Sequence, residues 1–331
     1  SSLLALALLL IGAQALAQTG SLVKVDGSST VFPITEAVAE EFQASTKNQT
    51  KVTVGVSGTG GGFKKFCRGE TDVQNASRPI QASEIAECKK SGVKFIELPI
   101  AYDAIAVVVN PKMTWLNEIT VEELKKMWEP TAQGKITRWN QINPKGPDAP
   151  MKLYGAGTDS GTFDYFTEAI VGKAKSSRGD YTASEDDNTI VQGVSKDTNA
   201  IGYFGLAYYE SNKKKLKALA IIGGDKSPMK NKAVLPSSET VENGNYFPLA
   251  RPAFIYVSEA SLKRPEVRKF TEFYIQNAPQ LVPEVKYVAL PAKAYEIGLD
   301  HVKKGKLGSV FDGHSEVGMK IEELMKREGK M

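Results

Sequence analysis

Short runs of β-branched residues alternate along the chain with segments whose apolar positions follow a helical period. Residues 51–56 (KVTVGV) predict a strand, and the apolar positions within residues 34–42 lie on one face of a helix that begins at Pro33. Another helix is predicted to begin at Thr120, because Thr120 and Glu123 have the spacing of a capping box. This alternation is typical of an α/β fold with mixed sheets.

Two apolar, strand-like stretches interrupt this pattern, at residues 101–110 (AYDAIAVVVN) and residues 252–257 (PAFIYV). We interpret them as crossovers, at which the chain leaves a first lobe and later returns to it. Lobe one would then comprise residues 21–101 together with 252–331, and lobe two would comprise residues 102–251. Two domains that follow one another along the chain are the alternative.

The N-terminal segment has the pattern of a signal peptide. An apolar run over residues 3–11 is followed by Ala15-Leu16-Ala17, a small-x-small sequence that is typical of a cleavage site. The run is shorter than the roughly 20 apolar residues that a helix needs to cross a bilayer, although a membrane anchor is the alternative. We therefore predict a partial signal peptide at residues 1–17, cleavage near Ala17 and a periplasmic location.

The composition bears on the size of the core, on nucleic acid as a partner and on the state of the cysteines. The chain has 331 residues, of which 41% are hydrophobic, so it can bury a large core. The formal net charge is only +4 and the two signs are interspersed, so a nucleic acid is not expected as a partner. The only cysteines, Cys67 and Cys88, predict a disulfide in an exported protein. Two buried free thiols are the alternative.

Four segments rich in Ser, Thr and Gly connect a predicted strand to the start of a predicted helix. They are loop 1 (residues 26–33, DGSSTVFP), loop 2 (56–63, VSGTGGGF), loop 3 (71–79, TDVQNASRP) and loop 4 (157–166, GTDSGTFDYF). In such loops hydroxyl and main-chain N–H groups gather at a helix N-terminus, where free donors and the helix dipole favour a bound anion. For any one loop, helix capping or a simple turn is the alternative.

Loops 3 and 4 add groups that suit an oxyanion. Loop 3 contains Arg78 directly before Pro79, and a planar guanidinium group can bind two oxygens of a tetrahedral oxyanion. A surface salt bridge is the alternative for this arginine. Loop 4 offers the Ser160 and Thr162 hydroxyls and the Gly161 amide from the second lobe. An anion held by all four loops would bridge the lobes and favour their closure.

These loops resemble the periplasmic phosphate-binding protein family, the substrate-binding component of the high-affinity phosphate ABC transporter. Together with Ile201-Gly202-Tyr203 they occur in the family order across nearly the whole chain. The resemblance implies a two-lobed periplasmic-binding-protein fold, with mixed sheets flanked by helices and a ligand cleft between lobes joined by two crossover strands. It also implies a monomer without enzyme activity or cofactor, with inorganic phosphate and membrane permease subunits as partners.

The family holds dehydrated phosphate with hydroxyls, main-chain amides, one arginine and one carboxylate. By this resemblance, the hydroxyl and amide ligands expected in this chain are Thr30, Val31, Ser57, Ser160, Gly161 and Thr162. Ser29 and Ser77, which lie in loops 1 and 3, are expected to bind phosphate as well.

The two charged ligands depart from the best-studied form of the family. Ser77 stands where that form has a carboxylate, and Ala156 stands where it has an arginine. The Ser-Arg-Pro sequence of loop 3 resembles a separate branch, in which Arg78 is expected to supply the guanidinium group. Arg178 is the next candidate.

The carboxylate matters for specificity, because monohydrogen phosphate has a proton to donate and sulfate has none. A buried carboxylate accepts that proton and repels sulfate. Asp159 is the preferred candidate because it adjoins Ser160, and Asp72 is the alternative.

Two other functions compete with phosphate binding. A hydrolase is disfavoured because residues 157–161 do not form a Gly-x-Ser-x-Gly elbow and the only histidines, His301 and His314, lie near the C-terminus. The sequence also lacks a Cys/His cluster with the spacing of a metal site. A binding protein for sulfate, molybdate or arsenate is the nearer alternative.

Overall fold

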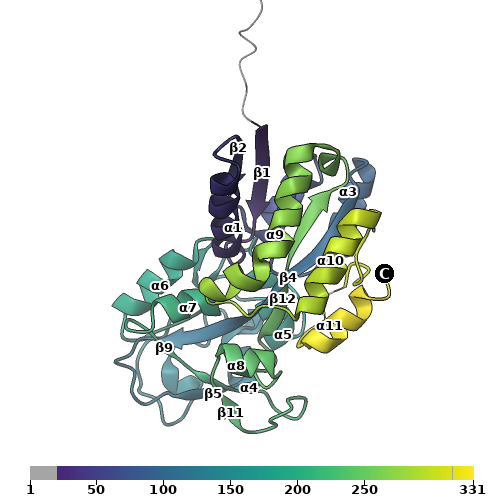
Figure 1. Ribbon diagram of the computed structural model, residues 1–331. Helices are drawn as coiled ribbons and strands as arrows, with labels where there is room; N and C mark the ends of the chain where they lie inside the picture. The colour runs from purple at the N-terminus through teal and green to yellow at the C-terminus, as the bar shows by residue number, and fades with distance from the viewer. Residues whose placement is uncertain (1–20, 315) are drawn as a thin grey trace, which may run out of the picture.

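The computed structural model describes residues 21–314 and 316–331 (Figure 1). The predicted signal peptide at residues 1–17 lies outside the described residues. Two lobes, each built on a sheet flanked by helices, are joined by the long strands β4 (Phe95–Val109) and β12 (Ala250–Ser258). This is the two-lobed α/β arrangement that the sequence predicts.

The first lobe has the strand order β2-β1-β3-β12-β4. Its parallel strands are β1 (Ser21–Gly27), β2 (Thr50–Val54) and β3 (Val73–Ala76), and these are followed in the chain by α1 (Phe32–Ser45), α2 (Gly58–Phe66) and α3 (Ala82–Lys90). The predicted helix at residues 34–42 is confirmed, with Pro33 in the first turn of α1 and Ile34, Val38 and Phe42 buried. The strand predicted at residues 51–56 is confirmed for residues 51–54, which belong to β2.

The strands β4 and β12 connect the lobes and are buried along their whole length. β4 pairs with β12 over residues 95–104 and then with β8 (Ala200–Gly205) over residues 105–109, both antiparallel. One continuous strand therefore contributes to both lobes. The predicted crossovers at residues 101–110 and 252–257 fall largely within these two strands, while the exact lobe boundaries stay a prediction.

The second lobe continues the sheet in the order β4-β8-β6-β7. Its other strands are β6 (Lys152–Ala156), β7 (Thr182–Ser184) and β9 (Lys217–Ala218), and a small separate sheet contains β5 (Glu118–Thr120), β10 (Ala220–Ile222) and β11 (Ala233–Val234). Its helices are α4 (Val121–Trp128), α5 (Gly161–Val171), α6 (Asp187–Lys196), α7 (Leu206–Ser211) and α8 (Ser238–Glu242), with single 3-10 turns at Pro130–Ala132 and Trp139–Gln141.

Aromatic packing holds α5 against the sheet of this lobe. The rings of Phe166 on α5 and Tyr203 on β8 stack with their centres 3.8 Å apart, and Trp128 meets both rings edge-on. The N-terminus of α5, where loop 4 lies, is therefore fixed relative to β8. The predicted capping box of α4 is confirmed, since Thr120 accepts a hydrogen bond from the Glu123 main-chain N–H at 3.0 Å.

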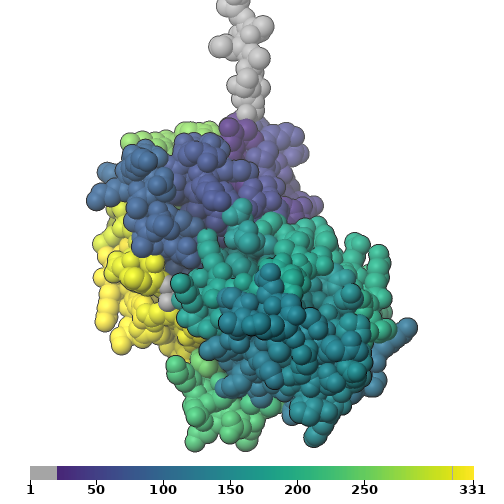
Figure 2. All heavy atoms as spheres, turned by 180° about the vertical axis from the view of Figure 1, so that it is seen from behind, coloured from purple at the N-terminus to yellow at the C-terminus, as the bar shows by residue number. Residues whose placement is uncertain are grey.

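The C-terminal segment covers the first lobe and reaches the second. It contains a 3-10 turn at Ser261–Lys263, α9 (Pro265–Glu284), α10 (Ala292–Lys304) and α11 (Ile321–Glu328). Phe42 on α1 packs edge-on against Phe270 on α9 with ring centres 5.3 Å apart. Figure 2 shows the yellow C-terminal residues along one side of both the blue and the teal parts of the molecule. The Gly318 N–H donates to the Tyr165 hydroxyl on α5 at 2.8 Å, which ties this segment to the second lobe.

The predicted disulfide is confirmed, because Cys67 and Cys88 are bonded to each other. It joins the C-terminal end of α2 to α3. Among the helices of residues 21–314 and 316–331, none has both the length and the apolar character needed to cross a membrane.

Candidate functional site

The four predicted loops meet where the two lobes touch. Loop 1 begins at the end of β1, loops 2 and 4 follow β2 and β6, and loop 3 contains β3; each leads toward a helix. Thr30 of loop 1 and Thr162 of loop 4 lie with their hydroxyl oxygens 3.0 Å apart, and both residues are fully buried. The Gly60 N–H of α2 donates to the Asp159 carbonyl of loop 4 at 2.9 Å. The sequence prediction that loops from both lobes converge is confirmed by these contacts.

Loop 1 places Thr30 at the centre of this junction. The Ser28 hydroxyl accepts the N–H groups of Thr30 (3.1 Å) and Val31 (3.4 Å), which is the local bonding that hydroxyl residues favour in turns. The Tyr208 hydroxyl of the second lobe donates to the Ser29 carbonyl at 3.1 Å, and the Tyr287 hydroxyl donates to the Thr30 carbonyl. The loop is therefore rigidly held, with Ser29, Thr30 and Val31 all buried.

Loop 2 brings Thr59 to the junction rather than the predicted Ser57. The Ser57 hydroxyl accepts a hydrogen bond from Lys65 Nζ at 2.7 Å, and the same ammonium group pairs with Asp26 of loop 1. Thr59 is fully buried in the first turn of α2 and bonds to Ser77 of loop 3, with the two hydroxyl oxygens 3.2 Å apart. Thr59 directly precedes the Gly60–Gly62 run, and this position was the signal that the sequence interpretation missed.

Loop 4 approaches the first lobe closely. The Ser160 side chain caps α5 by accepting the Thr162 N–H at 3.1 Å. A Cβ atom at Gly161 would lie 2.5 Å from the hydroxyl oxygens of both Ser77 and Thr59, so only glycine permits this contact between the lobes. The predicted residues Ser77, Ser160, Gly161 and Thr162 are thus brought together, and all four are buried.

Arg78 is buried beside the junction, but its guanidinium group is already bonded to the protein. Nε donates to Asp164 at 2.6 Å, while Nη1 and Nη2 donate to the two carboxylate oxygens of Glu84, each at 2.8 Å. Nη1 also donates to the Pro79 carbonyl at 3.1 Å. The expectation that Arg78 offers a free guanidinium group to an anion therefore does not agree with the structure, because Glu84, six residues away, and Asp164, 86 residues away, accept its hydrogen bonds.

A different arginine, Arg251 on β12, reaches the centre of the site. Its Nη2 donates to the hydroxyls of Thr162 (2.9 Å) and Thr30 (3.2 Å), and lies 3.4 Å from Oδ2 of Asp103 on β4. The side chain is 1% exposed, yet Nε and Nη1 have no hydrogen-bond partner. Arg251 and Asp103 are directly opposed in the β4–β12 ladder. The sequence signal for this pair was a charged residue in each of two mostly apolar strands, Asp103 in β4 and Arg251 in β12.

Two buried carboxyl groups accompany Arg251. Burial raises the pKa of Asp103 to about 6, and the positive charge of Arg251 opposes this rise. Burial likewise raises the pKa of Asp187, in the first turn of α6, to about 7, while Arg251 opposes the rise and the negative charge of Asp103 adds to it. Oδ2 of Asp187 has no hydrogen-bond partner. The site therefore combines one cation, two titratable acids and a set of hydroxyls.

The other charged candidates point elsewhere. The Asp159 carboxylate is 45% exposed and pairs with Lys64 at 3.1 Å, so it does not face Thr30 or Thr162. Asp72 is bonded to Arg264 at 2.9 Å and to the Ser261 hydroxyl at 2.8 Å. Their predicted role as the proton acceptor does not agree with these contacts, because each carboxylate already has partners outside the junction.

Arg178, the second arginine candidate, is also engaged. It pairs with Asp180 at 2.6 Å and donates to the carbonyls of Met127 and Ile136. These partners lie within the second lobe, around α4 and the turn that follows it. Arg178 therefore stabilises that lobe and does not reach the junction.

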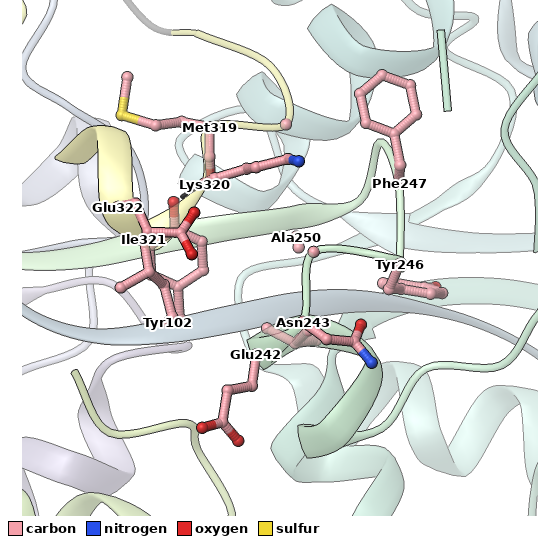
Figure 3. Close-up of a pocket in the computed structure, with 13 residues that line it drawn as sticks. Tyr102, Glu242, Asn243, Tyr246, Phe247, Ala250, Met319, Lys320, Ile321 and Glu322 are labelled. Atoms are coloured by element: carbon pink, nitrogen blue, oxygen red, sulfur yellow. Dashed lines mark hydrogen bonds between the residues drawn. The ribbon is translucent and has the colours of Figure 1, made fainter. Parts of the chain in front are cut away.

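A separate pocket of about 120 Å³ lies beside the connecting strands (Figure 3). It is lined by Tyr102 of β4, Ala250 of β12, residues 241–244, 246–247 and 318–322. Side chains alternate between the faces of a strand, so Tyr102 points away from the face that holds Asp103. The pocket is therefore on the opposite side of β4 from the site around Arg251. In residues 21–314 and 316–331, no group of three or more His, Cys, Asp or Glu side chains could hold a metal ion.

Comparison with known proteins agrees with this arrangement. The model of the PBP superfamily domain matches residues 12–278. Protein SphX of Synechococcus elongatus is 56% identical over 93% of this chain and 89% of its own length. The phosphate-binding protein PstS of Staphylococcus saprophyticus is 40% identical over 82% of both chains. The chain is a PstS-like protein of the PBP superfamily.

A solved structure supports the same assignment for this PstS-like protein. The crystal structure of a "possible phosphate binding protein" from Planctomyces limnophilus is 49% identical, has a TM-score of 0.63, and covers 87% of this chain and 99% of its own. The resemblance seen in the loops is thereby confirmed. A PstS-like protein is a binding protein, so the prediction that the chain is not an enzyme is confirmed by its relatives.

Proposed function

We propose that this chain binds inorganic phosphate between its two lobes and delivers it to the permease subunits of an ABC transporter. The main supporting observation is Arg251, whose Nε and Nη1 lack partners although the side chain is buried among hydroxyl groups from both lobes. Buried N–H groups without partners are unfavourable, because their hydration is lost and nothing replaces it. An oxyanion at this position would supply the missing acceptors.

The neighbouring groups suit phosphate in particular. Hydroxyls and main-chain amides donate to phosphate oxygens, and the N-termini of α1, α2 and α5 favour a negative charge. We propose as uncharged ligands Ser29, Thr30, Val31, Thr59, Ser77, Ser160, Gly161 and Thr162, with Thr59 in place of Ser57. Arg251 takes the part that the sequence assigned to Arg78. The name of the PstS relative, which describes a phosphate-binding protein, supports the same ligand.

Asp103 is the proposed acceptor for the proton of monohydrogen phosphate. Its carboxyl pKa of about 6 leaves it mostly ionised at neutral pH, and it lies 3.4 Å from Arg251. Sulfate has no proton to donate, so it would meet a buried carboxylate without a compensating hydrogen bond. Discrimination between the two anions follows from this unpaired charge.

Delivery to a membrane transporter requires that the protein be exported. The apolar run at residues 3–11 and the small-x-small sequence that ends at Ala17 support an extracytoplasmic location, with a periplasmic mature chain that begins near Gln18. We further propose that the protein acts as a monomer, which offers its ligand to permease subunits with both lobes closed around it.

Calorimetric titration of the ligand-stripped chain tests the proposal. Phosphate should bind with one-to-one stoichiometry and micromolar or tighter affinity, and sulfate should produce no comparable heat. Titration with arsenate and molybdate tests the alternative oxyanions. If phosphate gave no binding while another oxyanion did, the site would be retained but the ligand would be reassigned. If no oxyanion bound, the proposed function would be refuted.

A further inference from the structure

Arg78 and Asp164 connect the two lobes through a buried ion pair. Arg78 belongs to loop 3 of the first lobe, and Asp164 lies in the first turn of α5 in the second lobe. Nε of Arg78 is 2.6 Å from Oδ2 of Asp164, and each side chain is only 2% exposed. Oδ1 of Asp164 is buried without a hydrogen-bond partner, so the contact of Oδ2 with Arg78 compensates the buried charge of this carboxylate.

The two acidic partners of Arg78 differ in the lobe that supplies them. Glu84 is in α3 of the first lobe, bonds to both Nη1 and Nη2, and also accepts the Gln81 N–H at 2.8 Å as part of the capping box of α3. The centre of the Phe63 ring on α2 lies 5.8 Å from the guanidinium carbon of Arg78. The first lobe alone therefore orients Arg78, and its Nε is directed toward the second lobe.

The ion pair is also adjacent to the proposed ligands on both sides. Ser77 immediately precedes Arg78, and Thr162 lies two residues before Asp164 on the same helix. A movement of α5 that brings Thr162 to Thr30 would bring Asp164 to Arg78 at the same time. The pair and the ligand contacts would thus form and break together.

We propose that Arg78 and Asp164 form a closure lock, an ion pair that is made only when the lobes are closed and that slows release of the bound anion. The inference rests on the proposed function, since it concerns the site that would hold phosphate. It assigns Arg78 the role of a positioning residue, which acts on the ligand through the closed arrangement rather than by direct contact.

The Arg78–Asp164 ion pair stabilises the closed arrangement of the lobes and is absent from the open one. With the lobes apart, Arg78 would keep Glu84, and Asp164 would be hydrated. With the lobes together, Asp164 loses water and gains a charge-assisted hydrogen bond to Nε. Removing one partner of such a pair leaves a buried charge without compensation, which disfavours the closed arrangement specifically. Since release requires opening, the dissociation rate should change more than the association rate.

Asp164→Asn is the direct test, with phosphate as the ligand and stopped-flow mixing as the assay. We expect phosphate release to become roughly tenfold faster or more, with the association rate changed by about threefold at most. Asp148→Asn is the matched control, because Asp148 pairs with Arg138 within the second lobe and is 70% exposed. An unchanged release rate in folded Asp164→Asn protein would overturn the closure lock.

A double-mutant cycle separates the lock from direct ligand contact by Arg78. If the pair acts as a unit, Arg78→Gln should weaken phosphate binding strongly in the wild-type background and by no more than about twofold in the Asp164→Asn background. If Arg78 touched phosphate directly, the loss would be the same in both backgrounds, and the lock would be refuted. Arg78→Lys keeps a positive charge beside Glu84, but a lysine ammonium group cannot bridge the carboxylates of Glu84 and Asp164. This variant should therefore also release phosphate faster.

These outcomes are distinct from failure of the proposed function. If wild-type protein does not bind phosphate, the proposed function fails, and the lock as a device for phosphate retention fails with it. If wild-type protein binds phosphate and the Arg251→Gln variant does not, while Asp164→Asn releases it at the wild-type rate, the function stands and the lock alone is refuted. Circular dichroism and thermal melting of each variant verify that it is folded.

Discussion

Replacing Arg251 by glutamine removes the cation at the centre of the proposed site and preserves a polar side chain. In the folded protein, Nη2 of Arg251 is bonded to Thr30 and Thr162, while Nε and Nη1 remain available to an anion. The variant retains all hydroxyl and amide donors of loops 1 to 4. A loss of affinity therefore reports the guanidinium group, through its direct contact with the anion and through its bonds to Thr30 and Thr162.

The expected loss of binding free energy follows from the number of Arg251 nitrogen atoms that would no longer donate to the anion. Hydrogen bonds to charged groups contribute about 1.5–3 kcal/mol each. Two nitrogen atoms of Arg251 lack partners, so their loss should cost about 3–6 kcal/mol, which corresponds to roughly two to four orders of magnitude in Kd. Arg251→Lys keeps the charge but offers a single point of contact, so its effect should be smaller.

Isothermal titration calorimetry with phosphate measures this effect, with Arg264→Gln as the control. Arg264 is a lobe-one arginine whose side chain is 44% exposed and which pairs with Asp72. Its replacement should change Kd by less than about twofold, because exposed ion pairs contribute little. If Arg251→Gln bound phosphate within about threefold of wild type, Arg251 would not be a ligand and the guanidinium group would have to come from elsewhere.

The remaining predictions concern specificity, pH and covalent stability. Asp103→Asn should weaken phosphate binding about tenfold and narrow its advantage over sulfate, measured by paired titrations, and unchanged selectivity would contradict the proton-acceptor role. Burial raises the pKa of Glu328 to about 9, and its two carboxylate oxygens have no hydrogen-bond partner. Because the folded chain holds this proton more tightly than the unfolded chain, whose carboxyl titrates near pH 4.3, the stability due to this group falls as the pH rises from about 4 through about 9. Glu328→Gln should therefore melt at a higher temperature than wild type at pH 8 and at the same temperature near pH 4; equal melting at pH 8 would contradict the reasoning. Replacing Cys67 and Cys88 by serine should lower the free energy of unfolding by about 3 kcal/mol in denaturant titrations, and a loss below about 1 kcal/mol would show that the disulfide adds little.

The elements of the fold were predictable wherever local chemistry dominates. Helix α1 begins at a proline and buries one apolar face, and α4 begins at a capping box, so both are visible in short windows of sequence. The Cys67–Cys88 disulfide was predictable from the only two cysteines of a chain whose N-terminal pattern predicts export. The division into lobes was visible as two apolar strands, although the exchange of partners along β4 depends on strands distant in the sequence.

The candidate site was only partly predictable. Thr30, Ser77 and Thr162 lie at the junction, as expected for hydroxyls in loops that lead to helix starts. The position of Thr59 at the junction depends on where α2 begins, which the spacing of Ser57 and Thr59 along the sequence does not reveal. Asp159 was chosen for its neighbour in the sequence, yet its carboxylate turns outward to Lys64.

Loops rich in hydroxyl and glycine residues between strands and helices of an α/β chain can be read from local sequence, because hydrogen-bond donors at a helix N-terminus and the period of apolar residues are local properties. Which buried charges keep nitrogen atoms without partners depends on the three-dimensional packing. Arg78 finds Asp164 86 positions away, whereas Arg251 meets Asp103 148 positions away and keeps two nitrogen atoms without partners. The pairing of buried charges depends on which strands and helices pack together, and residue spacing along the chain does not contain that information.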